Sequence, residues 1–438
     1  MSDTIAQIVT PPYPGAVGII RLSGDGSVPV VQKIFSNKSF REAESHRAYY
    51  GYIMEDGVPI DEVIVLAMLA PRSYTCEDVV EIQSHGNIHL LRRILDVLIA
   101  GGARLAEAGE FTKRAFLNGR LDLTQAEAVC DIINAASKSA QTAGLRRLQG
   151  HLRDKISNIR QEIIALVAEI EVSIDYPEHE MEQGNIENAK IRAEKILEEI
   201  REMTKNADIG RVLQYGIETA IIGKPNVGKS SVLNTILKEE RAIVTETAGT
   251  TRDTLTELVN IGEVTLRLTD TAGIRETSDC IEKIGVERAV LAARNADLIL
   301  WVVDGAQRDA DIENVLKDTD AKVIILSNKS DIRTECVKGL SVSAKTGAGF
   351  DELYKTINSM FLDNLTDIDV VCDKRHIELL DKTAQALADA INTANLGFGE
   401  DFLTQDFVNA YKFLGEIIGA ELGDDVCDTI FAKFCVGK

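Results

Sequence analysis

A glycine-rich loop of the type that binds phosphate lies near the middle of the chain, where residues 223–230 read Gly-Lys-Pro-Asn-Val-Gly-Lys-Ser. It stands between a short apolar run and a helical one, as phosphate-binding loops do, and this setting argues against a chance match. Glycines let backbone N–H groups converge on phosphate oxygens, Lys229 neutralises the β- and γ-phosphates as a catalytic residue, and the Ser230 hydroxyl can ligate Mg²⁺. The candidate nucleotide-binding residues of this loop are Asn226, Val227, Gly228, Lys229, Ser230 and Ser231.

A second group of candidate residues follows another apolar run and reads Asp270, Thr271, Ala272 and Gly273. The carboxylate can hold the water shell of the metal, and the flexible glycine can turn its N–H toward the γ-phosphate. The next residue is Ile274, at the place where Ras-like enzymes carry a water-orienting glutamine. Isoleucine cannot polarise water, so either hydrolysis is slow or another acid and another cation supply these functions.

The base is selected by a third group, Asn328-Lys329-Ser330-Asp331, which follows the run at 323–326. The Asp331 carboxylate can accept from both N1–H and the 2-amino group of guanine, whereas adenine has an acceptor at N1 and no 2-amino group. The sequence therefore predicts GTP rather than ATP. A backbone N–H from Ser343, Ala344 and Lys345 would complete the base pocket.

Between the first two groups lies a polar loop at 241–253, which contains Gly-Thr-Thr-Arg-Asp. A threonine hydroxyl here can complete the Mg²⁺ shell, and Thr251 is the candidate because the glycine two positions earlier lets the loop fold over the nucleotide. The alternative is an ordinary surface loop. The nucleotide-binding candidates of this loop are Thr245, Glu246, Thr247, Ala248, Gly249, Thr250 and Thr251.

The elements that must position these residues are short apolar runs alternating with helical segments. The runs at 219–222, 264–268, 298–303, 323–326 and 340–342 predict strands of a βαβ sheet with helices on its faces. Open parallel sheets bind ligands at the carboxyl ends of their strands, where the motifs above stand.

The segments before and after this region have a different pattern of apolar residues. Residues 1–118 mix β-like runs at 17–22, 63–69 and 79–82 with a helical pattern at 88–99, which indicates an α+β domain. Helical stripes at 156–170 and 377–391 lack a second layer of their own, so we expect them to pack together around an inserted domain. The predicted fold class is multidomain, with an α+β N-terminal domain, an all-α helical domain and an inserted α/β P-loop GTPase domain. The predicted boundaries are 1–118, 119–215, 216–363 and 364–438, the second and fourth segments forming the helical domain.

Composition narrows the class of protein. The 438 residues carry 48 Lys or Arg and 69 Asp or Glu, a net charge of −21, which disfavours a surface that grips a phosphate backbone everywhere. The seven cysteines include no Cys-x-x-Cys pair, so neither a disulfide scaffold nor a zinc ribbon fits. No apolar run is long enough to span a bilayer, no secretory signal is recognisable, and we expect a cytoplasmic protein without membrane contact.

The polar loop, the central motifs and both ends of the chain resemble the MnmE (TrmE) tRNA-modification GTPases. The ends read Asp-Thr-Ile at 3–5, Val-Gly-Ile-Ile-Arg-Leu-Ser-Gly at 17–24 and Phe-Cys-Val-Gly-Lys at 434–438, so the resemblance covers essentially the whole chain. It implies an N-terminal domain that binds folate and forms a homodimer, with the GTPase domain inserted in the helical domain. It also implies an MnmG (GidA)-type flavoprotein partner. Together the two would add a carboxymethylaminomethyl or aminomethyl group to the wobble uridine of tRNA, with 5-formyl- or methylene-tetrahydrofolate as the folate and glycine or ammonium as the amine source.

The resemblance also implies that hydrolysis depends on K⁺ and on dimerisation. The residues that match the K⁺ ligands of the family are Asn226, Thr245, Thr247 and Thr250. Glu282 matches the water-orienting acid of the family, which would explain why Ile274 is tolerated. A solvated glutamate at a helix start is the alternative for Glu282.

The folate site of the family corresponds to Arg21, Glu81, Arg120 and Lys438. Arg120 has an alternative, a helix-start cation that pairs with Asp122. Cys435 lies near that pocket in the family and is either reactive or buried. His85 and His89 are four residues apart, but Gly86 and Asn87 weaken a helix between them, and we interpret both histidines as structural.

Two other functions remain open from the residues. A GTP-regulated ribosome or RNA assembly factor would usually carry a basic RNA module, yet residues 366–438 hold 6 Lys or Arg against 14 Asp or Glu. A folate-dependent transferase with a merely regulatory GTPase domain is the third hypothesis.

Overall fold

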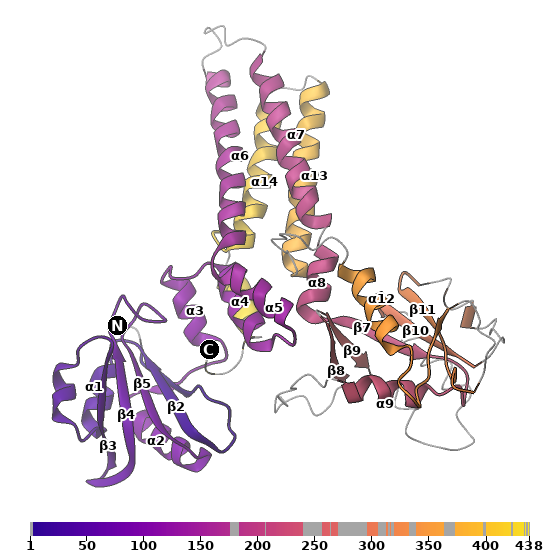
Figure 1. Cartoon of the computed structure of the whole chain (residues 1–438). Helices are drawn as coiled ribbons and strands as arrows, with labels where there is room; N and C mark the ends of the chain where they lie inside the picture. The colour runs from indigo at the N-terminus through magenta and orange to yellow at the C-terminus, as the bar shows by residue number, and fades with distance from the viewer. Residues whose placement is uncertain are drawn as a thin grey trace. The chain divides into compact units, whose positions relative to one another are not determined.

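The computed structural model describes residues 3–175, 184–205, 207–239, 256–262, 264–269, 296–304, 312–313, 316, 319–332, 339–362, 373–396, 400–421, 424–432, 434 and 437 (Figure 1). The chain divides into two compact units. The first comprises Met1–Cys130, Arg153–Arg160 and Tyr411–Lys438, and the second comprises Asp131–Leu152 and Gln161–Ala410. The domain boundaries expected from the sequence remain a prediction, because this division cuts helices rather than loops.

A six-stranded sheet forms the centre of the first unit, in the order β3-β4-β5-β2-β1-β6. Every pair is antiparallel except β1 with β6. Its strands are β1 (Ile5–Ile8), β2 (Gly15–Ser23), β3 (Arg47–Glu55), β4 (Val58–Met68), β5 (Val79–Gly86) and β6 (Arg104–Leu105). Three of them contain the predicted runs, whereas β1, β3 and β6 were not predicted.

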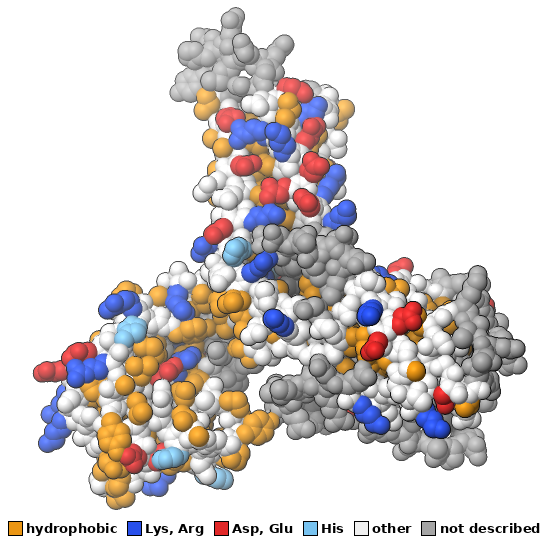
Figure 2. Space-filling model, in the orientation of Figure 1, with side chains coloured by type: hydrophobic (Ala, Val, Ile, Leu, Met, Phe, Trp, Pro, Cys, Tyr) orange, Lys and Arg blue, Asp and Glu red, His pale blue; other side chains and the backbone are white. Residues whose placement is uncertain are grey.

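One face of this sheet is covered by helices and the other is more open. Side chains of α1 (Ser27–Ile34) and α2 (Ile88–Ala100) join the buried core with Val63, Val65 and Ala67 of β4. Successive residues of a strand point to opposite faces, so Ile64, 44% exposed, faces the other side with Tyr50 and Tyr52 of β3. Figure 2 shows hydrophobic side chains gathered over these strands. The short helix η1 (Lys38–Glu42) completes this part.

The first unit also contains α3 (Glu110–Leu117), the start of α4 (Leu123–Asn134) and α15 (Asp424–Phe431). Leu123 and Phe431 share a small core with Phe434. Gly109 has φ 70°, and a Cβ there would come 2.5 Å from the Phe431 carbonyl oxygen, so only glycine allows this approach. A Cβ on Gly437 would lie 3.0 Å from the Ile8 carbonyl oxygen, which places the end of the chain beside β1.

The second unit contains α5 (Lys138–Leu148), α7 (Gly184–Lys205), α8 (Ala207–Tyr215) and α13 (Lys374–Leu396), together with parts of α6 (His151–Asp175) and α14 (Glu400–Ile418). Helix α7 packs along α13 (Figure 1). Helix α7 precedes and α13 follows the GTPase segment in sequence, so helices of the two flanks pack together as expected. That the stripe at 156–170, in α6, packs on 377–391 stays a prediction. No helix in the described part of the chain is long and apolar enough to cross a membrane.

A second six-stranded sheet has the order β12-β11-β10-β7-β9-β8 and is parallel except for β8. Its strands are β7 (Ile217–Ile222), β8 (Thr256–Ile261), β9 (Val264–Thr269), β10 (Leu298–Val303), β11 (Lys322–Ser327) and β12 (Leu340–Ser341). All six residues of β10 are buried, because cores lie on both faces of the sheet. Helices α9 (Lys229–Glu239) and α12 (Phe350–Leu362) contribute to one of these cores. The predicted strands are all present, and only β8 was not expected.

Candidate nucleotide-binding site

The glycine-rich loop joins β7 to α9 and depends on backbone conformations that favour glycine. Gly223 has φ 151° and Gly228 has φ 99°. A Cβ on Gly223 would lie 2.3 Å from the Val302 carbonyl oxygen, and one on Gly228 would lie 2.3 Å from Asn328 Nδ2. Asn226 adopts φ 64°, the left-handed region that asparagine tolerates better than most residues. The loop is therefore shaped by close contacts with its neighbours as well as by its own sequence.

Lys229 begins α9 and turns back over the loop. Its Nζ donates to the carbonyl oxygens of Gly223 and Lys224, both at 2.8 Å. Burial lowers the pKa of the ammonium because the charged form loses solvation. The positive charge is held within the loop, where phosphate oxygens would offset the cost of burial.

Asn328 ties together the three described motifs. Its Nδ2 donates to the Val227 carbonyl oxygen at 2.9 Å, and its Oδ1 accepts from the Ala344 N–H at 3.1 Å. The residue is 4% exposed, so both bonds are shielded from water. The side chain thus holds the phosphate loop next to the loops that contain Asn328 and Ala344.

Asp331 is the residue assigned to guanine recognition. The Ser343 hydroxyl donates to Asp331 Oδ1 at 2.8 Å and is itself fully buried. Thr235, on α9, donates to the Ala344 carbonyl oxygen at 2.8 Å. These bonds orient the carboxylate and the adjacent peptide, as a base pocket requires. Lys345 is exposed beside them.

Thr235 and Asp304 contact this site but were missed from the sequence. Asp304 directly follows β10, and its Oδ2 lies 2.6 Å from Lys329 Nζ. A carboxylate directly after the apolar run at 298–303 was the available sequence signal, but it points to this site only once β10 is known to lie between β7 and β11. Thr235 carries no comparable signal, since a threonine within a helix is common.

Several predicted residues lie outside the described part of the chain. These are Thr245, Glu246, Thr247, Ala248, Gly249, Thr250, Thr251, Asp270, Thr271, Ala272, Gly273, Glu282, Cys435 and Lys438. Ser230 and Ser231 are described at the start of α9, where a serine hydroxyl can reach a metal bound to phosphate. Within the described residues no group of three or more His, Cys, Asp or Glu could hold a metal ion.

Two of the four residues expected to bind folate, Arg21 and Arg120, lie over one aromatic ring in the first unit, and a third, Glu81, pairs with Arg21. Arg21 and Glu81 are direct cross-strand partners on β2 and β5, with Nε 2.8 Å from Oε1. The Arg21 guanidinium lies 5.3 Å from the Tyr74 ring centre, and that of Arg120 lies 4.8 Å from it. Arg120 also donates to the Tyr74 carbonyl oxygen at 2.9 Å. Tyr74 is a residue that the sequence analysis missed.

Arg21 is suited to hold an acidic or carbonyl-bearing ligand. Its Nη1 is buried and lacks a hydrogen-bond partner among the described residues, so a donor remains for an acceptor of the ligand. The suggested pairing of Arg120 with Asp122 is wrong, because the Asp122 carboxylate caps α4 by accepting from the Thr124 N–H at 2.7 Å. Lys438 follows Gly437, which lies beside β1.

The two histidines do not share a helix. His85 lies near the carboxyl end of β5, and its Nδ1 lies 2.8 Å from Asp61 Oδ1. His89 is in the first turn of α2, after the N-cap residue Asn87. Their spacing of four residues therefore spans a strand and a helix, and it does not create a helical metal pair.

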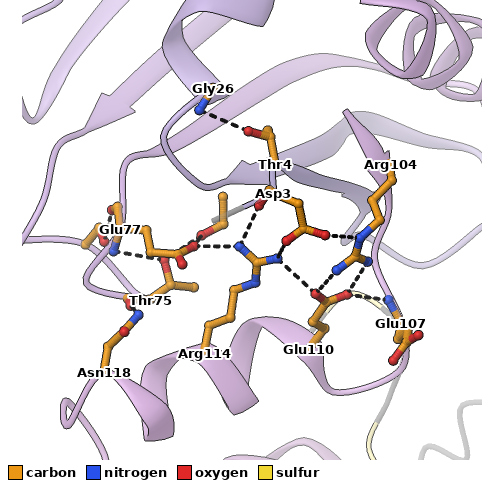
Figure 3. Close-up of polar contacts among 12 residues, drawn as sticks. Asp3, Thr4, Gly26, Thr75, Glu77, Arg104, Glu107, Glu110, Arg114 and Asn118 are labelled. Carbon is orange, nitrogen blue, oxygen red and sulfur yellow. Dashed lines mark hydrogen bonds and ion pairs between the residues drawn. The ribbon is translucent and has the colours of Figure 1, made fainter. Parts of the chain in front are cut away.

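A network of charges is centred on Arg114, which is largely buried, and reaches the more exposed Asp3 and Arg104 (Figure 3). Arg114 Nη2 donates to Asp3 Oδ1 at 2.7 Å and to Glu110 Oε1 at 3.0 Å. Its Nη1 donates to Glu77 Oε2 at 2.9 Å. Ser23 Oγ donates to the same Glu77 oxygen at 2.8 Å. The network joins the start of the chain, the loop before β5 and α3.

The network also holds the segment next to Tyr74. The Thr75 hydroxyl lies 2.6 Å from Ser23 Oγ, and the Thr75 carbonyl oxygen accepts from Asn118 Nδ2 at 2.7 Å. Cys76 follows with φ 59°, a conformation that costs a non-glycine residue about 1–2 kcal/mol. Bonds on both sides of Cys76 therefore maintain a strained turn that presents Tyr74 to Arg21.

Two carboxylates of the network remain ionised to low pH. Hydrogen bonding from Arg104 is the main reason that the pKa of Asp3 is lowered. Burial raises the pKa of Glu110, but bonds from Arg104, the Glu107 N–H and Arg114 outweigh burial and lower it overall. Their contribution to stability is present above the ordinary glutamate value of 4.5 and is lost as the pH falls through the lowered values.

Replacing Arg114 with methionine is expected to lower the free energy of unfolding of the first unit by about 3 kcal/mol, since three carboxylates would lose a buried partner. Circular dichroism in urea measures this loss. Arg92→Met, at an exposed arginine of α2, is the matched control and should change stability little. Trp301, the single tryptophan, lies in β10 and reports the second sheet separately. If the urea midpoint followed by Trp301 emission shifted as much as the midpoint followed by circular dichroism, the effect would not be local to the first unit.

Comparison with known proteins adds to this geometry. A family model described as the MnmE helical domain matches residues 123–435, and one described as the GTP-binding protein TrmE N-terminus matches residues 4–120. The tRNA modification GTPase MnmE of Streptococcus thermophilus is 43% identical over 449 residues, covering 100% of this chain and 98% of that relative. MnmE of Streptococcus mutans is 41% identical over 452 residues, covering 100% and 99%.

Solved structures that match are more distant. The G domain of the FeoB iron transporter of T. maritima is 22% identical, covers 32% of this chain and 94% of that chain, and has a TM-score of 0.24. The fold of the second sheet follows from its own strand order, β12-β11-β10-β7-β9-β8.

Proposed function

The chain belongs to the MnmE family of tRNA-modification GTPases, and from this premise we propose that it couples GTP hydrolysis to a folate-dependent modification of the wobble uridine of tRNA. The group added would be carboxymethylaminomethyl or aminomethyl. The observation that supports this most strongly is that base and phosphate motifs, about a hundred residues apart, meet through the side chain of Asn328.

GTP is proposed as the nucleotide because of Asp331. The Ser343 hydroxyl donates to this carboxylate at 2.8 Å and supports its orientation, and its oxygens would accept from N1–H and the 2-amino group of guanine. Lys229 is proposed to neutralise the β- and γ-phosphates, assisted by the N–H groups at the start of α9. Adenine would leave the carboxylate without donors, at a cost that excludes ATP.

Mg²⁺ and K⁺ are proposed as the ions of the site. Ser230 and Thr251 would hold Mg²⁺, and Asn226 with Thr245, Thr247 and Thr250 would hold K⁺. When bound, the two ions supply positive charge beside the phosphates. Asn226 supports this because its left-handed backbone, φ 64°, sets it at the exposed rim of the loop. Glu282 is proposed to orient the attacking water in place of a glutamine.

K⁺ is expected to raise the rate of GTP hydrolysis at least about tenfold over Na⁺, since carbonyl and amide oxygens can replace the hydration shell of the larger ion. Steady-state phosphate release in matched chloride salts measures this. Asn226→Ala should abolish the difference, whereas Asn234→Ala, at an exposed asparagine of α9, should retain it. Equal rates in both salts for the unaltered chain would remove the K⁺ proposal.

The first unit is proposed to bind a reduced folate, 5-formyl- or methylene-tetrahydrofolate, at Arg21, Glu81, Arg120 and Lys438. The unpartnered Nη1 of Arg21 supplies a donor, and the Tyr74 ring gives an apolar wall beside the two guanidinium groups. Arg120 would pair with a carboxylate of the folate tail. Bound folate supplies the one-carbon unit, and the chain's own residues orient it.

The proposed partners are a second copy of this chain, an MnmG (GidA)-type flavoprotein and tRNA, and the proposed place of action is the cytoplasm. A homodimer is supported by the exposed residues Tyr50, Tyr52 and Ile64 on the open face of the first sheet. The helical domain is proposed to comprise residues 119–215 and 364–438, with the G domain at 216–363 inserted.

Reconstitution tests this function directly. The chain is incubated with tRNA, GTP, a methylene-tetrahydrofolate and glycine, with and without the flavoprotein, and the wobble nucleoside is identified by mass spectrometry. We expect the modified nucleoside only when both proteins are present. Modification by this chain alone would overturn the partner, in favour of a lone folate-dependent transferase. Hydrolysis stimulated by ribosomal RNA without any modified nucleoside would favour an assembly factor.

A further inference from the structure

Three loops of the nucleotide site leave adjacent strands of one sheet. The phosphate loop follows β7, Asp304 follows β10, and the loop that begins with Asn328 follows β11. These strands are consecutive in the sheet and parallel, with β10 in the middle. Their carboxyl ends therefore meet at one edge, with the end of β10 between the loops assigned to phosphate and to base.

A single ammonium group contacts both neighbouring loops. Lys329 Nζ lies 2.6 Å from Asp304 Oδ2 and donates to the Asn226 carbonyl oxygen at 3.1 Å. The Asp304 side chain is 17% exposed and that of Lys329 is 35% exposed, so the ion pair is partly shielded from water. A partly buried ion pair of this kind is stronger than an exposed one.

The two residues that the ammonium helps to join have strained backbones. Lys329 has φ 66° and Asn226 has φ 64°, in the left-handed region that non-glycine residues seldom adopt, although asparagine tolerates it better than most. Such conformations persist only where surrounding contacts maintain them. The long lysine side chain is flexible by itself, and the ion pair with Asp304 restrains it in a position from which it also donates to Asn226.

We propose that Asp304 is a positioning residue of the nucleotide site: it holds Lys329 against the Asn226 carbonyl and so locks the phosphate loop and the base loop in their binding geometry. The inference rests on the proposed placement of guanine and phosphates in these loops. Asp304 touches neither in this scheme, because it acts through Lys329.

This proposal and simple electrostatics predict opposite effects of removing Asp304 on the affinity for a nucleotide. A carboxylate near phosphates repels them, so its removal by itself would tighten binding of a nucleotide. If Asp304 positions Lys329, its removal weakens binding, because the ammonium and the loop behind it become mobile.

The experiment measures the affinity of the full chain for a fluorescent GDP. We expect Asp304→Asn and Lys329→Met each to weaken binding about tenfold, the loss of a hydrogen bond to a charged group. The double variant should bind no more than about twofold worse than Lys329→Met, because both changes remove one linkage. Glu218→Gln is the matched control, since it breaks another ion pair of this sheet, 2.7 Å from Arg267, and should leave the affinity unchanged.

The proposal would be overturned if Asp304→Asn bound GDP as well as the unaltered chain or more tightly. It would also be overturned if the affinity of the double variant fell by the product of the two single losses. Trp301 emission shows whether each variant is folded. If Asp304→Asn unfolds, Asp304→Glu carries the test, because it retains the charge and alters only its reach: weaker binding supports positioning, and equal binding contradicts it. Failure of the unaltered chain to bind GDP would instead refute the proposed function.

Discussion

Replacing Lys229 with methionine is expected to lower kcat/KM for GTP hydrolysis by about a thousandfold. The ammonium is held inside the phosphate loop by carbonyl oxygens at 2.8 Å, and its burial already disfavours its charge. The protein maintains this positive charge where the β- and γ-phosphates would lie. The charge would therefore stabilise the transition state more than bound GTP, because negative charge develops there during hydrolysis. Phosphate release at several GTP concentrations separates kcat from KM.

Lys224→Met is the control for this change. Lys224 belongs to the same loop, but its side chain is exposed, and its backbone carbonyl oxygen accepts from Lys229. The substitution removes the same charge, and we expect the rate to stay within about threefold of the unaltered chain, as for a screened surface charge. Equal losses in the two variants would mean that net charge, rather than the position of Lys229, drives the effect.

Asp331→Asn is expected to weaken GDP binding by about a thousandfold and to create binding of the xanthine nucleotide. Guanine presents two donors to the carboxylate, whereas xanthine has an oxygen at C2 that can accept from the new amide. The expected reversal follows from hydrogen-bond polarity, because the two side chains have nearly the same shape. Competition of GDP and XDP against a fluorescent nucleotide measures both affinities.

Ser343→Ala provides the comparison. It leaves the carboxylate in place and removes only the hydroxyl that donates to it at 2.8 Å. We expect GDP binding to weaken about tenfold with the preference for guanine intact. If Asp331→Asn still preferred GDP, the assignment of this carboxylate to the base would be wrong.

Much of the fold followed from local pattern. The strands β7, β9, β10 and β11 were predictable because a sheet covered on both faces requires continuous apolar runs, as at 298–303. Strand β3 was missed because its buried residues alternate with exposed tyrosines, and β8 because it runs antiparallel at the sheet edge. Packing between the two flanks was predictable because the apolar stripes at 156–170 and 377–391 each needed a surface to cover them. That α7 is the helix lying along α13 was decided by the tertiary structure.

The candidate site divides in the same way. Lys229, Asn328 and Asp331 were recognisable because their chemistry resides in contiguous residues at strand ends. Asp304, Thr235, Tyr74 and the Arg114 network were not, because their roles depend on which strands are neighbours and on contacts across the sheet. A lone carboxylate after β10 has no meaning until β10 is placed between β7 and β11. Residue types and short spacings specify the reaction, whereas long-range packing decides which side chains hold the reacting groups in place.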